Sequence, residues 1–131
     1  MAETDKHFFD VLKENGVTCL DAGYMKFKFI YKKTLTVEGH DCWGYTDFHL
    51  GHIALSTTLE NDAARLTCIH EMLHVLFELV GLGDREDKSE LPSMTNEDLV
   101  QDTTRGLALL MTLNPKLFAI LNVRPQEAPQ N

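Results

Sequence analysis

The chain has 131 residues, of which 44% are hydrophobic and 24% are charged, proportions that are ordinary for a globular domain. This length predicts one domain, large enough to bury a core. There are 12 Lys and Arg residues against 20 Asp and Glu residues, so the formal net charge is −8. That balance argues against nucleic acid or an anionic membrane as the main partner, because both select clustered positive charge.

The cysteines and the start of the chain predict a cytoplasmic protein. Cys19, Cys42 and Cys68 are sparse and odd in number, which does not fit a disulfide framework and indicates a reducing compartment. The first residues lack the basic-then-apolar order of a signal peptide. The sequence contains no apolar run of the length, about 18 residues, that a membrane span needs.

The first half of the chain predicts a short helix and a small sheet. Residues 5–15 are typical of an amphipathic helix. At 24–31, apolar side chains alternate with lysines, which predicts a half-buried strand. Residues 34–41 are polar and turn-like. Short strands are expected at 42–48 and 53–56, joined by a loop, so that the sheet would have about three strands.

The second half of the chain predicts three helices. The first spans 59–80 and ends at glycines, and its apolar residues lie on so many sides that we expect it to be central and buried. A polar loop follows at 84–93. Further helices are expected at 96–113 and 115–121, the latter with Pro115 at a favoured first position. The buried set expected for the longer of these two is Leu99, Val100, Leu107, Leu110 and Met111.

Together these elements predict an α+β fold in which the small sheet packs on the central helix and further helices follow. We expect one domain over residues 1–123. Residues 124–131 are rich in Pro and Gln and are typical of a disordered tail.

One motif in the central helix points to chemistry, namely His70-Glu71-Met72-Leu73-His74. Positions i and i+4 lie one above the other on a helix face, so His70 and His74 can bind one Zn²⁺ at about 2.0–2.1 Å each. Glu71 is rotated by about 100° from His70, so it flanks the metal without being a ligand. From there a carboxylate can accept a proton from the water that the metal activates.

A structural reading of the same residues is two buried histidines with hydrogen-bond partners and a glutamate in a side-chain pair. Burying His70, Glu71 and His74 in so apolar a helix is costly unless they are paired or coordinate a metal. This cost favours the metal site. Zinc fits the donors, and two histidines with a carboxylate also suit Fe(II).

A third protein ligand is expected, because catalytic zinc usually has three. No histidine follows His74, which leaves a downstream acid or an upstream histidine. Glu78 lies one turn beyond His74 on the same helix, too far along the axis to complete a tetrahedral site. Acids in the polar loop would be poorly fixed in position. Glu97 and Asp98 open the next helix. Asp98 suits a capping box with Thr95, which leaves Glu97 as the favoured ligand and Asp98 as the alternative.

The residues quoted so far resemble those of small phage and prophage metallopeptidase-like proteins, often grouped with the ImmA/IrrE-type metallo-endopeptidases. The resemblance covers about residues 24–121, and the histidine motif is its most specific part. The other segments that carry it are Trp43-Gly44-Tyr45, Ile53-Ala54-Leu55-Ser56, Glu97-Asp98-Leu99-Val100, Arg105-Gly106-Leu107 and Asn114-Pro115.

This resemblance implies a compact α+β zincin domain, a glutamate as third ligand, carried here onto Glu97, and an intracellular regulator or processing enzyme. In zincin folds an edge strand beside the active-site helix binds substrate by strand addition, and 53–56 is the candidate. Asp102 is a candidate partner for a ligand histidine. Candidate donors to the oxyanion of the reaction are Tyr45, His49, His52 and Arg105, although each is more often an ordinary strand, turn or surface residue.

The sequence therefore predicts a zinc-dependent peptidase-like hydrolase with Glu71 as general base and an intracellular protein or peptide as substrate. Two alternatives stay open. One is a regulatory or binding module, phage-encoded, with a structural or non-proteolytic zinc, which acts on a host or phage protein. The other is a metal-dependent hydrolase of a non-peptide bond, because activated water does not itself select the carbonyl that it attacks.

Overall fold

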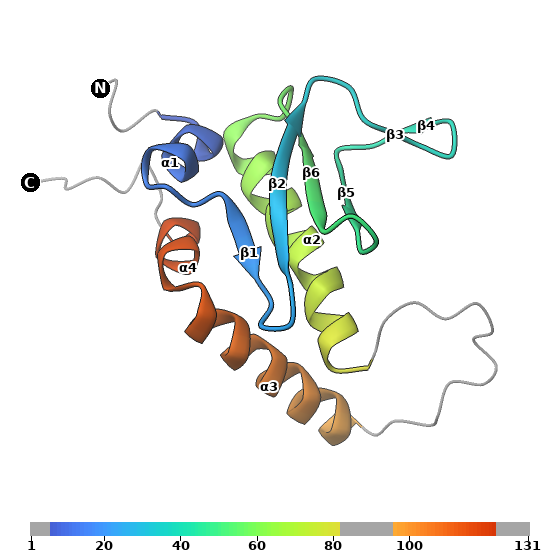
Figure 1. Ribbon diagram of the computed structural model, residues 1–131, viewed down its shortest axis with the longest axis vertical. Coiled ribbons are helices and arrows are strands. Elements are labelled where there is room, and N and C mark those ends of the chain that lie inside the picture. Colours follow the sequence, from blue (N-terminus) through green and yellow to red (C-terminus); the bar gives the residue numbers. More distant parts are fainter. Residues whose placement is uncertain (1–5, 82–95, 123–131) are drawn as a thin grey trace, which may run out of the picture.

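The computed structural model describes residues 6–81 and 96–122, and within them the chain is a mixed α+β protein (Figure 1). The elements in chain order are α1 (Phe8–Glu14), β1 (Cys19–Asp21), β2 (Lys26–Lys32), β3 (Thr36–Val37), β4 (His40–Asp41), β5 (Gly44–Asp47), β6 (His52–Ser56), α2 (Asn61–Leu79), α3 (Asn96–Leu113) and α4 (Pro115–Leu121). The predicted loop at 84–93 and the predicted tail at 124–131 lie outside the described residues.

The main sheet has four strands in the order β1-β2-β6-β5. β1 is antiparallel to β2, β2 is parallel to β6, and β6 is antiparallel to β5. The expected number of three strands was therefore wrong, because the three-residue β1 is too short to show alternation. β5 forms one edge of the sheet, whereas β6 is central.

A small second sheet lies within the segment that was expected to be only turn-like. β3 and β4 pair antiparallel, with Val37 opposite His40. Glu38 and Gly39 connect them with φ of 52° and 81°. Two successive positive φ angles give a tight turn whose twist matches that of a two-stranded ribbon.

The core lies between the main sheet and α2. On β2 the alternation is as predicted, since Phe27 and Phe29 are buried and the lysines between and before them are exposed. All four apolar or small residues from Ile53 to Ser56 are buried, because β6 has a strand on either side. α2 crosses one face of this sheet (Figure 1), and its buried side contains Ala64, Cys68, Met72, Val75 and Leu76.

The observed boundaries of the later helices agree with the prediction better than the observed burial of their residues does. The bounds of α3 and α4 agree with the prediction, and α2 is shorter than expected by a residue or two at each end. Of the five α3 residues that were expected to be buried, only Leu110 is buried. The other four are 41–56% exposed, namely Leu99, Val100, Leu107 and Met111. α3 packs on α2 along a narrow strip centred on Gly106, and this packing leaves its other apolar positions at the surface.

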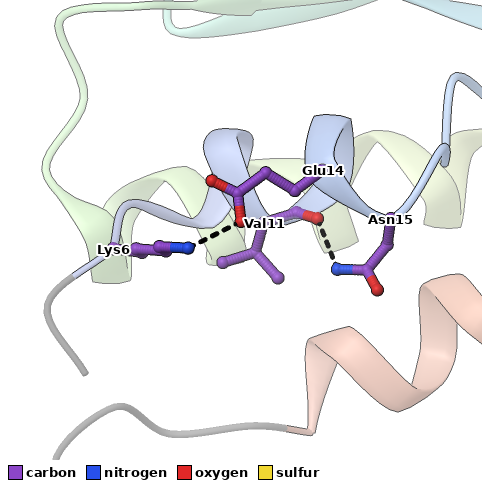
Figure 2. Close-up of polar contacts among 4 residues, drawn as sticks. All are labelled: Lys6, Val11, Glu14 and Asn15. Carbon is purple, nitrogen blue, oxygen red and sulfur yellow. Dashed lines mark hydrogen bonds and ion pairs between the residues drawn. The ribbon is translucent and has the colours of Figure 1, made fainter. Parts of the chain in front are cut away.

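Local polar contacts define α1. The His7 side chain accepts a hydrogen bond from the Phe9 amide and so caps the helix. Figure 2 shows two further contacts, an ion pair of 2.9 Å between Lys6 and Glu14 and a hydrogen bond of 2.8 Å from the Asn15 side chain to the Val11 carbonyl. Two long-range hydrogen bonds tie α1 to the start of α2, one of 2.8 Å between His7 Nε2 and the Leu59 carbonyl and one of 2.7 Å from the Phe8 amide to the Asn61 side chain.

No helix in the two described ranges is both long enough and apolar enough to cross a membrane.

Asn114 ties the junction of α3 and α4 to the outer edge of β1. Its side chain accepts a hydrogen bond from the Asp21 amide at 2.7 Å and donates to the Asp21 carbonyl at 2.8 Å. It also donates to the Leu110 carbonyl at 2.9 Å. Asn114 thus pairs with β1 as a neighbouring strand would, and it is buried.

We predict that Asn114→Ala lowers the free energy of unfolding by about 2–3 kcal/mol, because it leaves buried backbone groups without partners. Asn15→Ala is the control, since it removes one exposed hydrogen bond and should cost less than about 1 kcal/mol. Urea denaturation of both variants provides the measurement. Equal losses for the two variants would show that Asn114 does not hold the junction.

Candidate metal centre

α2 brings His70, Glu71 and His74 together. One potential ligand atom from each residue lies within 4.8 Å of the others. The two imidazole centroids are 5.0 Å apart, with the ring planes at 71°. The i, i+4 spacing on an α-helix therefore has the consequence predicted from the sequence, because both rings project from the same part of the helix surface.

The three residues differ sharply in exposure. The His70 side chain is 68% exposed and the Glu71 side chain only 5%, while His74 is half-buried. All three side chains were expected to be buried, and for His70 this was wrong. α2 turns one side toward the sheet, and a rotation of about 100° per residue takes His70 from that side toward solvent.

Thr46 holds the buried carboxylate from the edge strand β5. Its hydroxyl donates to Glu71 Oε1 at 2.7 Å and also lies 3.3 Å from the Glu71 carbonyl oxygen. The other carboxylate oxygen, Oε2, is 4.0 Å from His70 Nε2. One oxygen of Glu71 is thus fixed by a hydrogen bond, and the other is directed toward the imidazoles.

No local sequence pattern predicts the contact between Thr46 and Glu71. Strand alternation puts Gly44 and Thr46 on the same face of β5, but only the packing of α2 shows that this is the face toward Glu71. A Cβ atom at Gly44 would come within 2.9 Å of Thr67 on α2 and of the Ala54 carbonyl. Glycine at this position therefore allows β5 to approach α2 closely.

The charge of Glu71 affects two neighbouring thiols. Burial, with the charge of Glu71 as a second cause, raises the pKa of Cys68 to about 12. The same two causes, burial first, raise the pKa of Cys42, against a smaller lowering by a hydrogen bond from the Gly44 backbone. Both side chains are therefore uncharged thiols at neutral pH.

A hollow of about 530 Å³ opens beside the cluster. His70 and Glu71 form one end of it. The remaining lining residues are Cys42, Trp43, Gly44, Ala63, Leu66 and Thr67. The cluster is therefore next to space that a ligand can enter.

The donor set fits a zinc ion. Two imidazole nitrogens that bind one Zn²⁺ tetrahedrally at about 2.0–2.1 Å are about 3.4 Å apart. The nitrogens of His70 and His74 are already within 4.8 Å, and the exposed His70 ring has room to rotate. Glu71 flanks the pair as a base would, with its carboxylate held by Thr46.

The packing of α3 fixes its direction relative to α2. A Cβ atom at Gly106 would come within 2.9 Å of Val80 and 3.0 Å of Leu76. Two cavities between the helices show which way α3 runs. Leu107 and Leu110, late in α3, line one cavity with Met72 and Leu73. Asp102 and Arg105, earlier in α3, line the other cavity with Leu79 and Val80, which come later in the chain than Met72 and Leu73. α3 is therefore antiparallel to α2.

This direction takes Glu97 away from the histidines. Glu97 precedes Gly106 by two and a half turns of helix, about 13 Å along the axis, so it lies past the C-terminal end of α2, where Gly106 packs against Val80. Its side chain is exposed, as is that of Asp98. Neither belongs to the cluster of potential ligands that the described residues form. Glu97 as third ligand thus stays a prediction from the sequence, without support from this arrangement.

The other sequence candidates also lie apart from the cluster. Asp102 forms an ion pair of 3.3 Å with Arg105 on α3 rather than supporting a histidine. Because Gly44 and Thr46 face α2, Tyr45 and Asp47 lie on the opposite face of the sheet. His52 lies on that face too, because it pairs with Asp47. His49 is exposed in the turn after β5.

The strand expected to receive substrate was wrongly chosen. Residues 53–56 belong to β6, which has β2 on one side and β5 on the other. The edge strand beside α2 is β5 (Figure 1).

No protein-family model, curated protein or solved structure matches this chain.

From the helix arrangement we predict that Glu97→Gln leaves zinc affinity within about twofold of wild type. A residue that ligates zinc contributes far more than this, since even its outer-shell partners are worth about 10–100-fold in affinity. Competition with a chromophoric chelator measures the affinity, with His74→Ala as the variant that should lose zinc. A large loss for Glu97→Gln would show that α3 reaches the site in the zinc-bound protein.

Proposed function

We propose that the chain is a zinc-dependent peptidase-like hydrolase that acts on an intracellular protein. The observation that carries this proposal is the cluster of His70, Glu71 and His74, in which two accessible imidazoles stand beside one buried carboxylate. The imidazoles are the proposed zinc ligands, and Glu71 is the proposed general base. The resemblance of this motif to that of ImmA/IrrE-type metallopeptidases supports a peptide as substrate, within a zincin-like domain.

The proposed role of Glu71 follows from its two oxygens. A zinc ion at this site would supply a Lewis acid and lower the pKa of coordinated water to about 7. Thr46 binds Glu71 Oε1, so Oε2, on the side of His70, is the oxygen left to take a proton from the attacking water. The same oxygen then delivers the proton to the leaving amine of the peptide.

The edge strand β5 supports an extended substrate. Strand addition needs a free row of backbone donors and acceptors beside the reacting groups. β5 is at the edge of the main sheet, and Thr46 on this strand contacts the proposed base. A peptide paired with β5 would therefore run past the cluster.

A second candidate function, a regulatory or binding module with a structural zinc, is favoured by the surface of α3. Five large apolar side chains on this helix are 41–56% exposed, namely Leu99, Val100, Leu107, Leu109 and Met111. Apolar surface of this kind often marks a site of protein association. Chelation separates the two candidates, because removal of a structural zinc lowers the melting temperature strongly, whereas removal of a catalytic zinc abolishes hydrolysis first.

We predict that Glu71→Gln lowers peptide hydrolysis by about 10²–10⁴-fold, the usual contribution of a general base, without loss of zinc. Glu78→Gln is the matched control, since Glu78 is an exposed glutamate on the same helix. Hydrolysis of denatured protein substrates and zinc content by atomic spectroscopy are measured for both. Hydrolysis by Glu71→Gln at the wild-type rate would remove Glu71 from the mechanism.

A further inference from the structure

The hollow beside the cluster follows one side of α2. Ala63, Leu66, Thr67 and His70 all line it, and their spacing of three and four residues puts them on one helix face. From His70 back to Ala63 this face is about 10 Å long. The opposite wall comes from Trp43 and its neighbours at the start of β5. The hollow therefore begins at the proposed reacting groups and extends away from His74.

Two large apolar side chains in this hollow are the most exposed of their kind in the described part of the chain. Leu66 is 66% exposed and Trp43 is 65% exposed. One comes from the helix and the other from the segment before β5, so they approach the hollow from different elements. Contact with an apolar group would remove both surfaces from water, which is favourable.

The walls of the hollow are held in place by the fold. The Trp43 carbonyl accepts a hydrogen bond of 2.9 Å from the Ser56 amide, so its backbone is fixed to β6 although its indole is exposed. The close approach of Gly44 to Thr67 sets the distance between β5 and α2. A ligand would meet these walls already formed, which lowers the entropy lost on binding.

The chemistry of the lining excludes a charged occupant. Only His70 and Glu71 among the lining residues can carry charge, and both lie at the end next to the proposed zinc site. Glu71 is buried and already accepts a hydrogen bond from Thr46. A lysine or glutamate side chain of a substrate would lose its hydration beside Leu66 and Trp43 without gaining a partner.

We propose that this hollow is a specificity site that receives a bulky apolar side chain of a peptide substrate, with Trp43 and Leu66 as the residues that contact it. This inference rests on the proposed function, because it assigns a substrate class to the same site. Its volume of about 530 Å³ is in the range of sites that accept small molecules. The substrate class is thus an extended peptide with a large aliphatic or aromatic residue next to the scissile bond.

Trp43 is the only tryptophan in the chain, so its fluorescence reports directly on this hollow. The test titrates the Glu71→Gln protein with acetylated, amidated pentapeptides of alanine whose central residue is phenylalanine, leucine, lysine or glutamate. We expect the phenylalanine and leucine peptides to shift the emission to shorter wavelength. We also expect them to bind at least about tenfold more tightly than the charged peptides, the smallest discrimination usual for an apolar pocket.

Leu66→Gln and Leu50→Gln form a matched pair for this experiment, because the two leucines are 66% and 61% exposed. Leu50 lies in the turn between β5 and β6 and does not line the hollow. Leu66→Gln should weaken binding of the phenylalanine peptide about tenfold, and Leu50→Gln should change it less than about twofold. Both leucine substitutions are made in the Glu71→Gln protein. Equal affinity of the Leu66→Gln variant and its Glu71→Gln parent, equal affinity for charged and apolar peptides, or unchanged Trp43 emission would each overturn the proposal.

Rates of hydrolysis by the zinc-loaded wild type separate this proposal from the proposed function. If no peptide is cut but the apolar peptides still bind at Trp43, the hollow stands as a binding site and the hydrolase proposal fails. If all four peptides are cut equally without a change in Trp43 emission, the hydrolase proposal stands and the specificity site is wrong.

Discussion

The hydrogen bond between Thr46 and Glu71 joins the edge of the sheet to the central helix, and the chemistry proposed for this chain depends on it. Glu71 is the one charged side chain that is buried among the described residues. Removal of a carboxylate from water is unfavourable unless a partner compensates it. The Thr46 hydroxyl provides that partner at 2.7 Å. A leucine at the same place would pack against the sheet without this cost, so the acid is better explained by a role in chemistry than by stability.

The strand β5 organises both parts of the site through residues on one of its faces. Thr46 fixes the carboxylate, and Gly44, two residues earlier, lets the strand lie close to Thr67 on α2. Trp43 precedes this pair and forms a wall of the hollow. A larger residue at Gly44 would push β5 away from α2. That displacement would alter the position of the proposed general base, Glu71, and the width of the hollow together.

Much of the fold could be predicted from the sequence where a local signal is strong. Pro115 at a favoured first position marks the start of α4, and alternating lysines and aromatic residues identify β2. The pairing of His70 with His74 likewise follows from helix geometry alone. In each case the deciding signal lies within a few residues of the element that it describes.

The rest depends on contacts between distant segments. Apolar residues on α3 were expected to be buried, but which side of a helix meets a neighbour is set by the neighbour, and here Gly106 makes the closest approach. The central position of β6 follows from strand order, which local patterns do not encode. Local patterns also do not encode the direction of α3 relative to α2, and this direction sets the distance of Glu97 from the histidines.

The proposed chemistry depends on a single divalent ion bound between His70 and His74. Titration of the purified protein with Co²⁺, followed by its visible absorption, tests this binding most directly. We expect one Co²⁺ per chain with the strong absorption of a four- or five-coordinate site. Zn²⁺ should displace it. His70→Ala or His74→Ala should abolish the signal, and His52→Ala should leave it intact. Absence of a bound ion in the wild type, or a signal that persists in both the His70 and the His74 variants, would contradict the proposed metal site.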